Sequence, residues 1–247
     1  MRRIRLELSY DGSAYSGWQV QPGLPTIQGE LQRVLSRIEE APVSVHGSGR
    51  TDAGVHALAQ VAAFNLRNPI PTQNLQRAVN RLLPKDIRVN GVTEAAPGFH
   101  PRHDAVAKTY RYRIYREAVC PPFERFYVWH QASPLNEAAM ERCARQYLGC
   151  HNFRAFAATD ERYTPEADMH RSIFAITLER KGPLLVFEVR GSGFLKHMVR
   201  NLIGALVEVG VENLTKHQVK EMLSTGVRSA GIRTAPSSGL FLVNVNY

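Results

Sequence analysis

The 247-residue sequence contains only three cysteines, and no two of them have the spacing of a CxxC pair. Cys120, Cys143 and Cys150 therefore indicate neither a disulfide framework nor a four-thiolate zinc site, and they favour a reducing compartment. Long hydrophobic runs are also missing. The N-terminus has no apolar segment typical of a signal peptide, and no stretch approaches the length of a membrane span. These absences predict a globular cytoplasmic protein without membrane association.

Motifs that hold cofactors or metals are absent as well. The sequence has no phosphate-binding P-loop, no dinucleotide fingerprint, no HExxH pattern and no zinc deaminase signature. His100 and His103 have a spacing that zinc could use, but no pair of cysteines accompanies them. Surface or capping histidines are therefore the preferred interpretation, and metal chemistry is not indicated.

Acidic residues are outnumbered by basic ones. Thirty-one Lys and Arg against 22 Asp and Glu give a formal charge of +9, which favours polyanionic partners. The alternative is a basic surface that only keeps the protein soluble. Net charge alone supports this alternative and a polyanion-binding surface about equally. The arginines lie beside aromatic residues and glycines rather than in a charged tail, and this favours nucleic acid.

Hydrophobic periodicity predicts a mixed α/β chain in two weakly related halves, 1–104 and 105–247, with the junction at residues 97–104 and no flexible linker. The first half contains these predicted elements: a strand over 4–10 ended by Asp11-Gly12, a helix from Thr26 with Ile27, Leu31, Val34, Leu35 and Ile38 on one side, strands over 43–46 and 58–64, and a helix stopped by Pro84.

The second half repeats a similar order of elements. These are a strand over 107–116, a helix with Met140, Cys143, Ala144, Tyr147 and Leu148 on one face that ends at Gly149, strands over 172–180 and 184–190, a long helix over about 194–209, a shorter helix opened by a Thr215–Gln218 capping box, and a strand over 240–247.

The densest candidate for chemistry is the glycine-rich run at residues 47–56, GSGRTDAGVH, between two predicted strands. Such a loop lets the backbone approach a ligand closely. Arg50 beside Asp52 favours the ionised carboxylate, which can act as a nucleophile. The ordinary alternative is a turn aspartate that bonds its own backbone. Because a plain turn would not need Arg, Thr and His together with three glycines, we predict that Asp52 is the reactive group.

A second candidate is the strand at residues 108–116, which alternates aromatic and basic side chains. Its two predicted faces carry Lys108, Tyr110, Tyr112 and Ile114, and Thr109, Arg111, Arg113 and Tyr115. Aromatic rings stack on unpaired bases and guanidinium groups bind phosphates, so this strand is a candidate RNA-binding surface. A half-buried strand with a solvated Arg face explains the pattern equally well.

The third candidate is the predicted helix near residues 194–209, on whose flank Lys196, His197 and Arg200 fall together. A cation fixed on a packed helix orients a buried carboxylate better than one on a loop. Arg200 is therefore the candidate partner of Asp52. A solvated basic face is the interpretation that this helix alone would favour.

At the GRTDAGVH run the chain resembles the TruA-type family of tRNA pseudouridine synthases, and the likeness extends over nearly its whole length. Any single block could arise by chance, but together and in this order they are highly specific. Ser48, where alanine is common, and Ser237-Ser238 are small departures. The other matching blocks are Tyr10-Asp11-Gly12, Gly17-Trp18-Gln19, Phe99-His100-Pro101-Arg102, Lys108-Thr109-Tyr110-Arg111-Tyr112, Gly193-Phe194-Leu195, Met198-Val199-Arg200-Asn201, Ala235-Pro236 and Gly239-Leu240.

The resemblance implies a role for several side chains. Asp52 would be the catalytic aspartate, Arg200 would pair with it, and Tyr110 would pack against the target base. Arg50 would fill the place of the flipped base, and Leu240 would line the pocket. We expect the remaining substrate contacts from Lys108, Arg111, Lys196 and His197.

The resemblance also implies an α+β pseudouridine synthase fold. Its two similar halves would each have a mainly antiparallel sheet flanked by helices, joined into one extended sheet around a basic cleft. The first half would carry the Asp52 loop, and the second the Tyr110 strand and the Arg200 helix. A homodimer, the absence of any metal or organic cofactor, and uridines 38, 39 and 40 of the tRNA anticodon stem-loop as targets are implied in the same way.

The expected reaction turns a uridine out of the helix, breaks its N-glycosidic bond after attack by Asp52, and rejoins the uracil through C5. Substrate and product are isomers, so the reaction needs no redox cofactor or energy source. Two other functions remain open. A non-catalytic RNA-binding protein would prefer a Lys at position 52, and a hydrolase of the glycosidic bond usually needs a second carboxylate.

Overall fold

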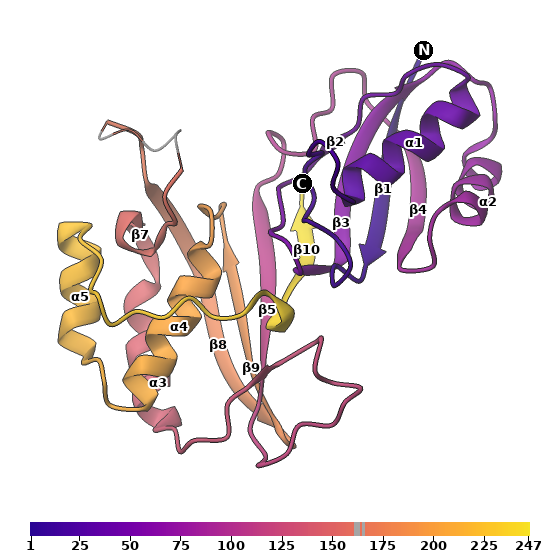
Figure 1. Cartoon of the computed structure of the whole chain (residues 1–247). Helices are drawn as coiled ribbons and strands as arrows, with labels where there is room; N and C mark the ends of the chain where they lie inside the picture. Colours follow the sequence, from indigo (N-terminus) through magenta and orange to yellow (C-terminus); the bar gives the residue numbers. More distant parts are fainter. Residues whose placement is uncertain (161–163, 165) are drawn as a thin grey trace. The chain divides into compact units, whose positions relative to one another are not determined.

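The computed structural model describes residues 1–160, 164 and 166–247, and it contains two compact units (Figure 1). Unit 1 comprises Met1–Val106 and Phe241–Tyr247, and unit 2 comprises Ala107–Leu240. The expected halves met at residues 104 and 105. The units differ from those halves chiefly at the end of the chain, where the last strand joins unit 1 because it pairs there. Within the described residues, no helix combines the length and apolarity needed to span a membrane.

The sheet of unit 1 is built around β3, and all but one of its strand pairs are antiparallel. The strand β1 pairs with both β3 and β4, β2 pairs with β3, and β10 adds to β3 in parallel through Phe241 and Leu242. The bounds are β1 Arg2–Tyr10, β2 His46–Gly47, β3 His56–Leu66, β4 Ile87–Ala95 and β10 Leu240–Asn246.

Two helices complete unit 1. The helix α1 (Ile27–Glu39) begins where the Thr26 side chain accepts a hydrogen bond from the Gly29 amide, and it buries Ile27 and the apolar residues spaced after it. The helix α2 (Thr72–Leu82) contacts β4 and ends before Pro84. Both helices were predicted from their periodicity, and the structure confirms them.

The predicted strand at residues 43–46 is wrong except at its last residue. Side chains of α1 satisfy the backbone there, because Ser36 Oγ accepts from the Val43 amide at 2.9 Å and Gln28 Nε2 donates to the Val45 carbonyl at 2.8 Å. Val43 and Val45 are still buried. Their alternating burial imitated a strand, although the hydrogen bonds run to a helix instead of a sheet ladder.

Unit 2 also has a mainly antiparallel sheet. The strand β9 lies between β5 and β8, β7 pairs with β8, and only β6 runs parallel to its partner, β5. The bounds are β5 Ala107–Tyr115, β6 Trp129–His130, β7 Gly149–Asn152, β8 His170–Lys181, β9 Leu184–Gly191, and for the helices α3 Glu137–Ala144, α4 Met198–Gly210 and α5 Lys216–Thr225. The mixed α+β class is confirmed.

Two predicted helices of unit 2 have different ends. The helix α3 ends at Ala144 and continues only as a short 3₁₀ turn, Arg145–Tyr147, so that Leu148 is 41% exposed instead of facing the core. The helix α4 begins at Met198, because His197 has a φ of 59° and a left-handed residue cannot continue a right-handed helix backwards. Lys196 and His197 therefore precede the helix, and their predicted position on its flank is wrong. The Thr215–Gln218 capping box of α5 is confirmed.

Candidate active site

The loop at residues 48–55 connects β2 to β3 and carries Asp52 within unit 1. The Ser48 amide donates to the Val61 carbonyl at 2.7 Å, which continues the pairing of the two strands into the loop. The loop then closes with a turn in which the Val55 amide donates to the Asp52 carbonyl at 3.1 Å. Gly54, the third residue of this turn, has a φ of 75°, a conformation that favours glycine. The half-buried Asp52 thus lies at a fixed turn.

The N-terminal segment after β1 packs directly against this loop. A Cβ atom at Gly12 would lie 2.0 Å from the Val55 carbonyl oxygen, so only glycine allows the two backbones to approach so closely. The Trp18 amide donates to the Thr51 carbonyl at 3.0 Å, and the Gly54 amide donates to the Tyr15 carbonyl at 3.3 Å. The segment therefore fixes the backbone on both sides of Asp52.

A buried polar network holds the entry of the loop. The Tyr10 hydroxyl lies 2.8 Å from Thr51 Oγ1, and Ser48 Oγ donates to Gln60 Oε1 at 2.5 Å. Gln60 Nε2 in turn donates to the Gly49 carbonyl at 3.1 Å. Burial raises the pKa of the Tyr10 hydroxyl to about 12, and its hydrogen bonds to Thr51 and Gln60 oppose this rise. The network ties β1 and β3 to the residue before Asp52.

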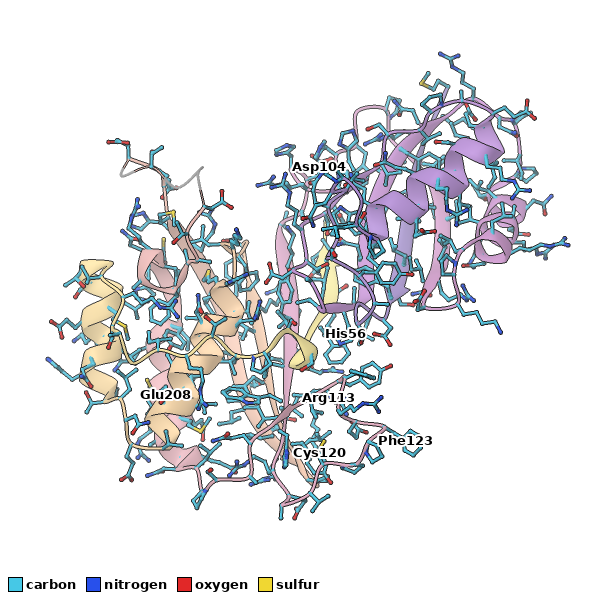
Figure 2. All side chains as sticks on the ribbon, viewed as in Figure 1. His56, Asp104, Arg113, Cys120, Phe123 and Glu208 are labelled. Atoms are coloured by element: carbon cyan, nitrogen blue, oxygen red, sulfur yellow. The ribbon has the colours of Figure 1, made fainter. Side chains whose placement is uncertain are left out.

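His56 fixes the exit of the loop. Its Nδ1 accepts from the Gly12 amide at 3.1 Å and lies 3.1 Å from an Asp11 carboxylate oxygen, and its ring stacks on Phe241 at 4.7 Å. The ring is buried, and His56 is labelled in Figure 2. At the other end of the run, the exposed Arg50 donates through Nε to Gln19 Oε1 at 2.8 Å. Asp52 and Arg50 are the predicted site residues that unit 1 contains.

Unit 2 contains the predicted aromatic contact. Tyr110 on β5 is only 8% exposed, and its ring meets that of Phe194 edge to face at 5.1 Å. Two residues further along the strand, Tyr112 is fully buried and donates through its hydroxyl to the Pro236 carbonyl at 2.7 Å. Tyr110, Tyr112 and Ile114 are all buried, which agrees with the predicted face of this strand, whereas Arg111 and Arg113 are half-buried.

Arg200 lies in the first turn of α4, near this buried face of β5. Its Nε donates to the Ala235 carbonyl at 2.8 Å. Burial raises the pKa of the Tyr112 hydroxyl well above its ordinary value, and the positive charge of Arg200 opposes that rise. Unit 2 therefore brings Arg200 and the Tyr110–Tyr112 side of β5 into one region.

The other predicted contacts of unit 2 are distributed around this region. Lys196 lies 3.8 Å from the Asp160 carboxylate, and His197 is the left-handed residue that starts α4. Leu240 is buried where β10 begins, and Lys108 is half-buried near the start of β5. Arg111 donates through Nε and Nη2 to one oxygen of Glu188, at 2.8 and 2.6 Å. The guanidinium group of Arg111 is thus held by an ion pair within the sheet.

Three buried polar residues of the surrounding structure were missed by sequence reasoning. Gln60 in β3, and Asn201 and Glu208 in α4, lie in largely apolar elements and are buried. Burying a polar group is costly unless it is hydrogen-bonded, so each indicates a specific partner. A single polar residue inside an apolar run was the signal that could have identified them.

The histidines considered for metal binding form a cluster with His46 in unit 1. The His100 ring lies 4.2 Å from that of His103 and 5.3 Å from that of His46. Burial, and then the neighbouring His103, His46 and Arg3, lower the pKa of His100. Its Nδ1 accepts from the amides of Arg102 and His103 and so caps a turn. No group of three or more His, Cys, Asp or Glu able to hold a metal ion occurs among the described residues.

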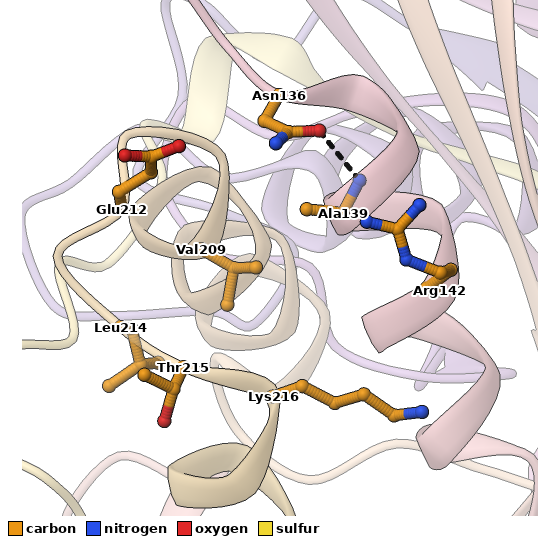
Figure 3. Close-up of a pocket in the computed structure, with 8 residues that line it drawn as sticks. All are labelled: Asn136, Ala139, Arg142, Val209, Glu212, Leu214, Thr215 and Lys216. Atoms are coloured by element: carbon orange, nitrogen blue, oxygen red, sulfur yellow. Dashed lines mark hydrogen bonds between the residues drawn. The ribbon is translucent and has the colours of Figure 1, made fainter.

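A separate pocket of about 250 Å³ lies in unit 2, between α3, the end of α4 and the start of α5 (Figure 3). None of the predicted site residues lines it. One side is formed by Asn136, whose side chain caps α3 by accepting from the Ala139 amide at 3.0 Å. Arg142 and Lys216 bring positive charge to the pocket, and Glu212 brings negative charge. We assign no function to this pocket.

Comparison with known proteins places this geometry in a family. The family model described as tRNA pseudouridine synthase matches residues 8–104 and 143–247. The chain is 55% identical over 247 residues to tRNA pseudouridine synthase A of Solibacter usitatus, covering 100% of both chains. It is 41% identical over 246 residues to the protein of that name from Moorella thermoacetica, covering 99% of both.

The corresponding protein of Geobacter sulfurreducens is 43% identical over 250 residues, with 100% of both chains covered. Among solved structures, the archaeal box H/ACA sRNP Nop10-Cbf5 complex is 13% identical with a TM-score of 0.33, and the match covers 95% of this chain and 58% of that chain. This likeness is too low to support an inference. The sequence matches, by contrast, extend over the whole chain. The chain belongs to the tRNA pseudouridine synthase family.

Proposed function

We propose that this protein converts uridine to pseudouridine at positions 38, 39 and 40 of the tRNA anticodon stem-loop, with Asp52 as the nucleophile. The observation that carries the proposal is the fixed loop at residues 48–55. A buried polar network holds its entry, His56 holds its exit, and Gly12 packs against its backbone. So many constraints around one half-buried carboxylate favour a catalytic role over an ordinary turn.

In the proposed reaction, the target uridine leaves the helix and stacks on Tyr110 while basic side chains bind the backbone phosphates. Flipping a base typically costs a few kcal/mol, and stacking contributes roughly 1 to 3 kcal/mol per base, so these contacts offset much of the cost. Arg50 would enter the position that the base leaves. Lys108, Arg111, Lys196 and His197 would supply further contacts, and Leu240 would line the base pocket.

Asp52 then attacks, either at the sugar or at the uracil ring, and the bond between N1 and C1′ breaks. The uracil turns, a new bond forms between C5 and C1′, and the bond to Asp52 breaks with its electron pair returning to the carboxylate. C5 then loses its proton, and N1 gains one. Arg200 would pair with the Asp52 carboxylate and keep it oriented. Atoms and electrons balance without a metal, an organic cofactor or an energy source, because the product is an isomer of the substrate.

The decisive experiment is the Asp52→Asn variant, assayed by tritium release from tRNA labelled at uracil C5. We expect loss of turnover with retained tRNA binding, because the amide keeps the shape of the side chain but is a poor nucleophile. Asp168→Asn, at an exposed carboxylate of unit 2, is the matched control and should keep full activity. Full turnover in the Asp52→Asn variant would exclude the proposal. Release of free uracil by the unaltered protein would indicate a hydrolase, and tRNA binding without any turnover would indicate a binding protein.

We further propose that the protein acts as a homodimer in the cytoplasm, with tRNA as its macromolecular partner. The basis for this is the family resemblance together with the sequence composition. Light scattering should give twice the mass of the 27.7 kDa chain. A monomer at assay concentration would contradict the dimer, and cell fractionation tests the location.

A further inference from the structure

Arg200 is bound by a segment that is distant in sequence, the strap at residues 228–236. The Arg200 Nε donates to the Ala235 carbonyl at 2.8 Å, and the Ala235 amide donates back to the Arg200 carbonyl at 3.2 Å. A guanidinium group is planar and rigid, so a hydrogen bond that fixes the direction of Nε also fixes the plane and direction of the two terminal nitrogens. The position of the Ala235 carbonyl therefore determines where Arg200 points.

The residue after Arg200 holds the strap in place. Asn201 is 1% exposed, and its Nδ2 donates to the Phe156 carbonyl at 2.7 Å. Its Oδ1 accepts from Thr234 Oγ1 at 2.7 Å and from Arg228 Nη2 at 3.2 Å. One buried amide thus joins α4 to both ends of the strap, and Thr234 is the neighbour of the residue that binds Arg200.

Other contacts support the strap but do not touch the Arg200–Ala235 pair. Arg233 donates through Nε at 3.2 Å to the buried carboxylate of Glu208, which lies about two turns beyond Arg200 on α4. Glu208 is labelled in Figure 2. A Cβ atom at Gly204 would lie 1.8 Å from the Arg233 carbonyl oxygen, so the strap lies directly on the helix backbone. The Tyr112 hydroxyl binds the Pro236 carbonyl at 2.7 Å. The strap is therefore bound along its length, and Thr234 directly precedes Ala235 in it.

We propose that Asn201 and Thr234 are positioning residues for Arg200, which place the Ala235 carbonyl so that the guanidinium group is directed at the reacting carboxylate. The inference rests on the function proposed above for Arg200. Neither residue needs to touch tRNA. Their loss should therefore lower the rate of the chemical step and leave tRNA binding unchanged, which distinguishes them from residues that only stabilise the fold.

Thr234→Val tests the proposal, because valine has nearly the shape of threonine but cannot donate to Asn201. Turnover, KM for tRNA and thermal melting are measured on the full chain, at a temperature where every variant is folded. We expect kcat to fall about tenfold, since small misplacement of a catalytic group has large effects on rate, while KM changes less than about twofold. Thr234→Ser keeps the hydroxyl and should restore kcat. Thr177→Val, on an exposed position of β8, is the matched control and should match the unaltered protein.

The same substitution in an Arg200→Lys background completes the test. Lysine lacks the planar group that Ala235 orients, so Thr234→Val should then lower kcat by less than about twofold, as expected for residues that act through one another. Unchanged kcat in Thr234→Val, no recovery in Thr234→Ser, or a full additional loss in the Arg200→Lys background would each overturn the positioning role. Full turnover of Arg200→Lys itself would instead contradict the function proposed for Arg200, and the positioning role with it.

Discussion

The Tyr10 hydroxyl lies 2.8 Å from Thr51 Oγ1, and Thr51 is the residue immediately before Asp52. Both residues are buried, and Tyr10 is the last residue of β1. The end of β1 is thus joined to the loop by a buried polar contact. A buried polar group that is left without its hydrogen-bond partner destabilises the folded protein. Removal of the Tyr10 hydroxyl should therefore change both stability and activity.

We expect Tyr10→Phe to destabilise the protein by about 1 to 3 kcal/mol at neutral pH, since Thr51 loses its buried partner. Turnover should fall as well, because the residue before Asp52 is no longer fixed. Urea denaturation and the tritium-release assay measure the two effects. Tyr127→Phe, outside the loop, serves as the control for removal of a tyrosine hydroxyl. A Tyr10→Phe variant with unchanged stability would show that the contact is not significant.

The effect of Tyr10→Phe on the free energy of unfolding should depend on pH. Burial raises the Tyr10 pKa from 10.0 to about 12 in the folded protein, so its contribution to stability is complete below about pH 10 and is lost as the pH rises towards 12. For a shift of this size the loss is roughly 2 to 3 kcal/mol. The stability difference between the unaltered protein and Tyr10→Phe should therefore shrink by this amount over that range. Because the other tyrosines are common to both proteins, their titration cancels in the difference.

Gly12→Ala should impair the loop more than its small change in size suggests. The added methyl group would lie 2.0 Å from the Val55 carbonyl oxygen, and a backbone atom cannot move aside as a flexible side chain can. We expect a loss of about 1 to 3 kcal/mol in the free energy of unfolding, as for overpacking in general, and a fall in kcat. Gly91→Ala is the control, because its methyl group would lie 4.0 Å from the nearest atom. Equal activity of the two variants would argue against loop fixation.

Tyr110→Leu should lower kcat/KM by about 5- to 100-fold, since base stacking on an aromatic ring contributes roughly 1 to 3 kcal/mol. Phe174→Leu removes an aromatic ring from a half-exposed position of β8 and should have little effect. Steady-state kinetics on unmodified tRNA gives the comparison. If the leucine variant at position 110 keeps full kcat/KM, the ring does not stack on the substrate base.

Glu188→Gln should strengthen tRNA binding by releasing Arg111 from its ion pair, in which two nitrogens of Arg111 bind one carboxylate oxygen. Arg111→Gln should have the opposite effect and reduce the dependence of binding on log salt concentration by about one unit, the loss of one phosphate contact. Filter binding at several salt concentrations measures both. Glu179→Gln, which disrupts a surface pair with Lys181, is the control. An unchanged salt dependence in Arg111→Gln would mean that Arg111 only stabilises the sheet.

Most helices and long strands could be predicted from the sequence, because each buries a face with a regular period. The helix α1 and the strand β5 are clear examples, and their buried residues follow the expected spacing. Errors occurred where local chemistry interrupts the period. Side chains of α1 satisfy the backbone at Val43 and Val45, and the left-handed His197 delays the start of α4. Neither feature alters the hydrophobic periodicity of the sequence.

Of the candidate site, the sequence indicated the glycine-rich loop around Asp52 but not the contacts that hold this loop. Glycines around a charged group marked residues 47–56 as unusual, since this composition costs conformational entropy. The support that Gln60 and Gly12 give to this loop, and the support that Asn201 gives to the strap, depend on contacts between residues far apart in the chain. Such contacts are determined by tertiary structure. Residues that act directly on a substrate are therefore easier to recognise than those that position them.

The strand β10 has a consequence for how the protein is made. Phe241 pairs with His56 in the parallel register of β10 and β3, and Tyr247 at the end of the chain donates to the Pro101 carbonyl at 2.8 Å. When the first 106 residues of the chain have emerged from the ribosome, the strand β10 of unit 1 has therefore not yet been synthesised. The histidine at the exit of the Asp52 loop must therefore wait for its stacking partner until the whole of unit 2 has been synthesised. We expect nascent chains that lack β10 to be inactive, because unit 1 is then incomplete beside the Asp52 loop.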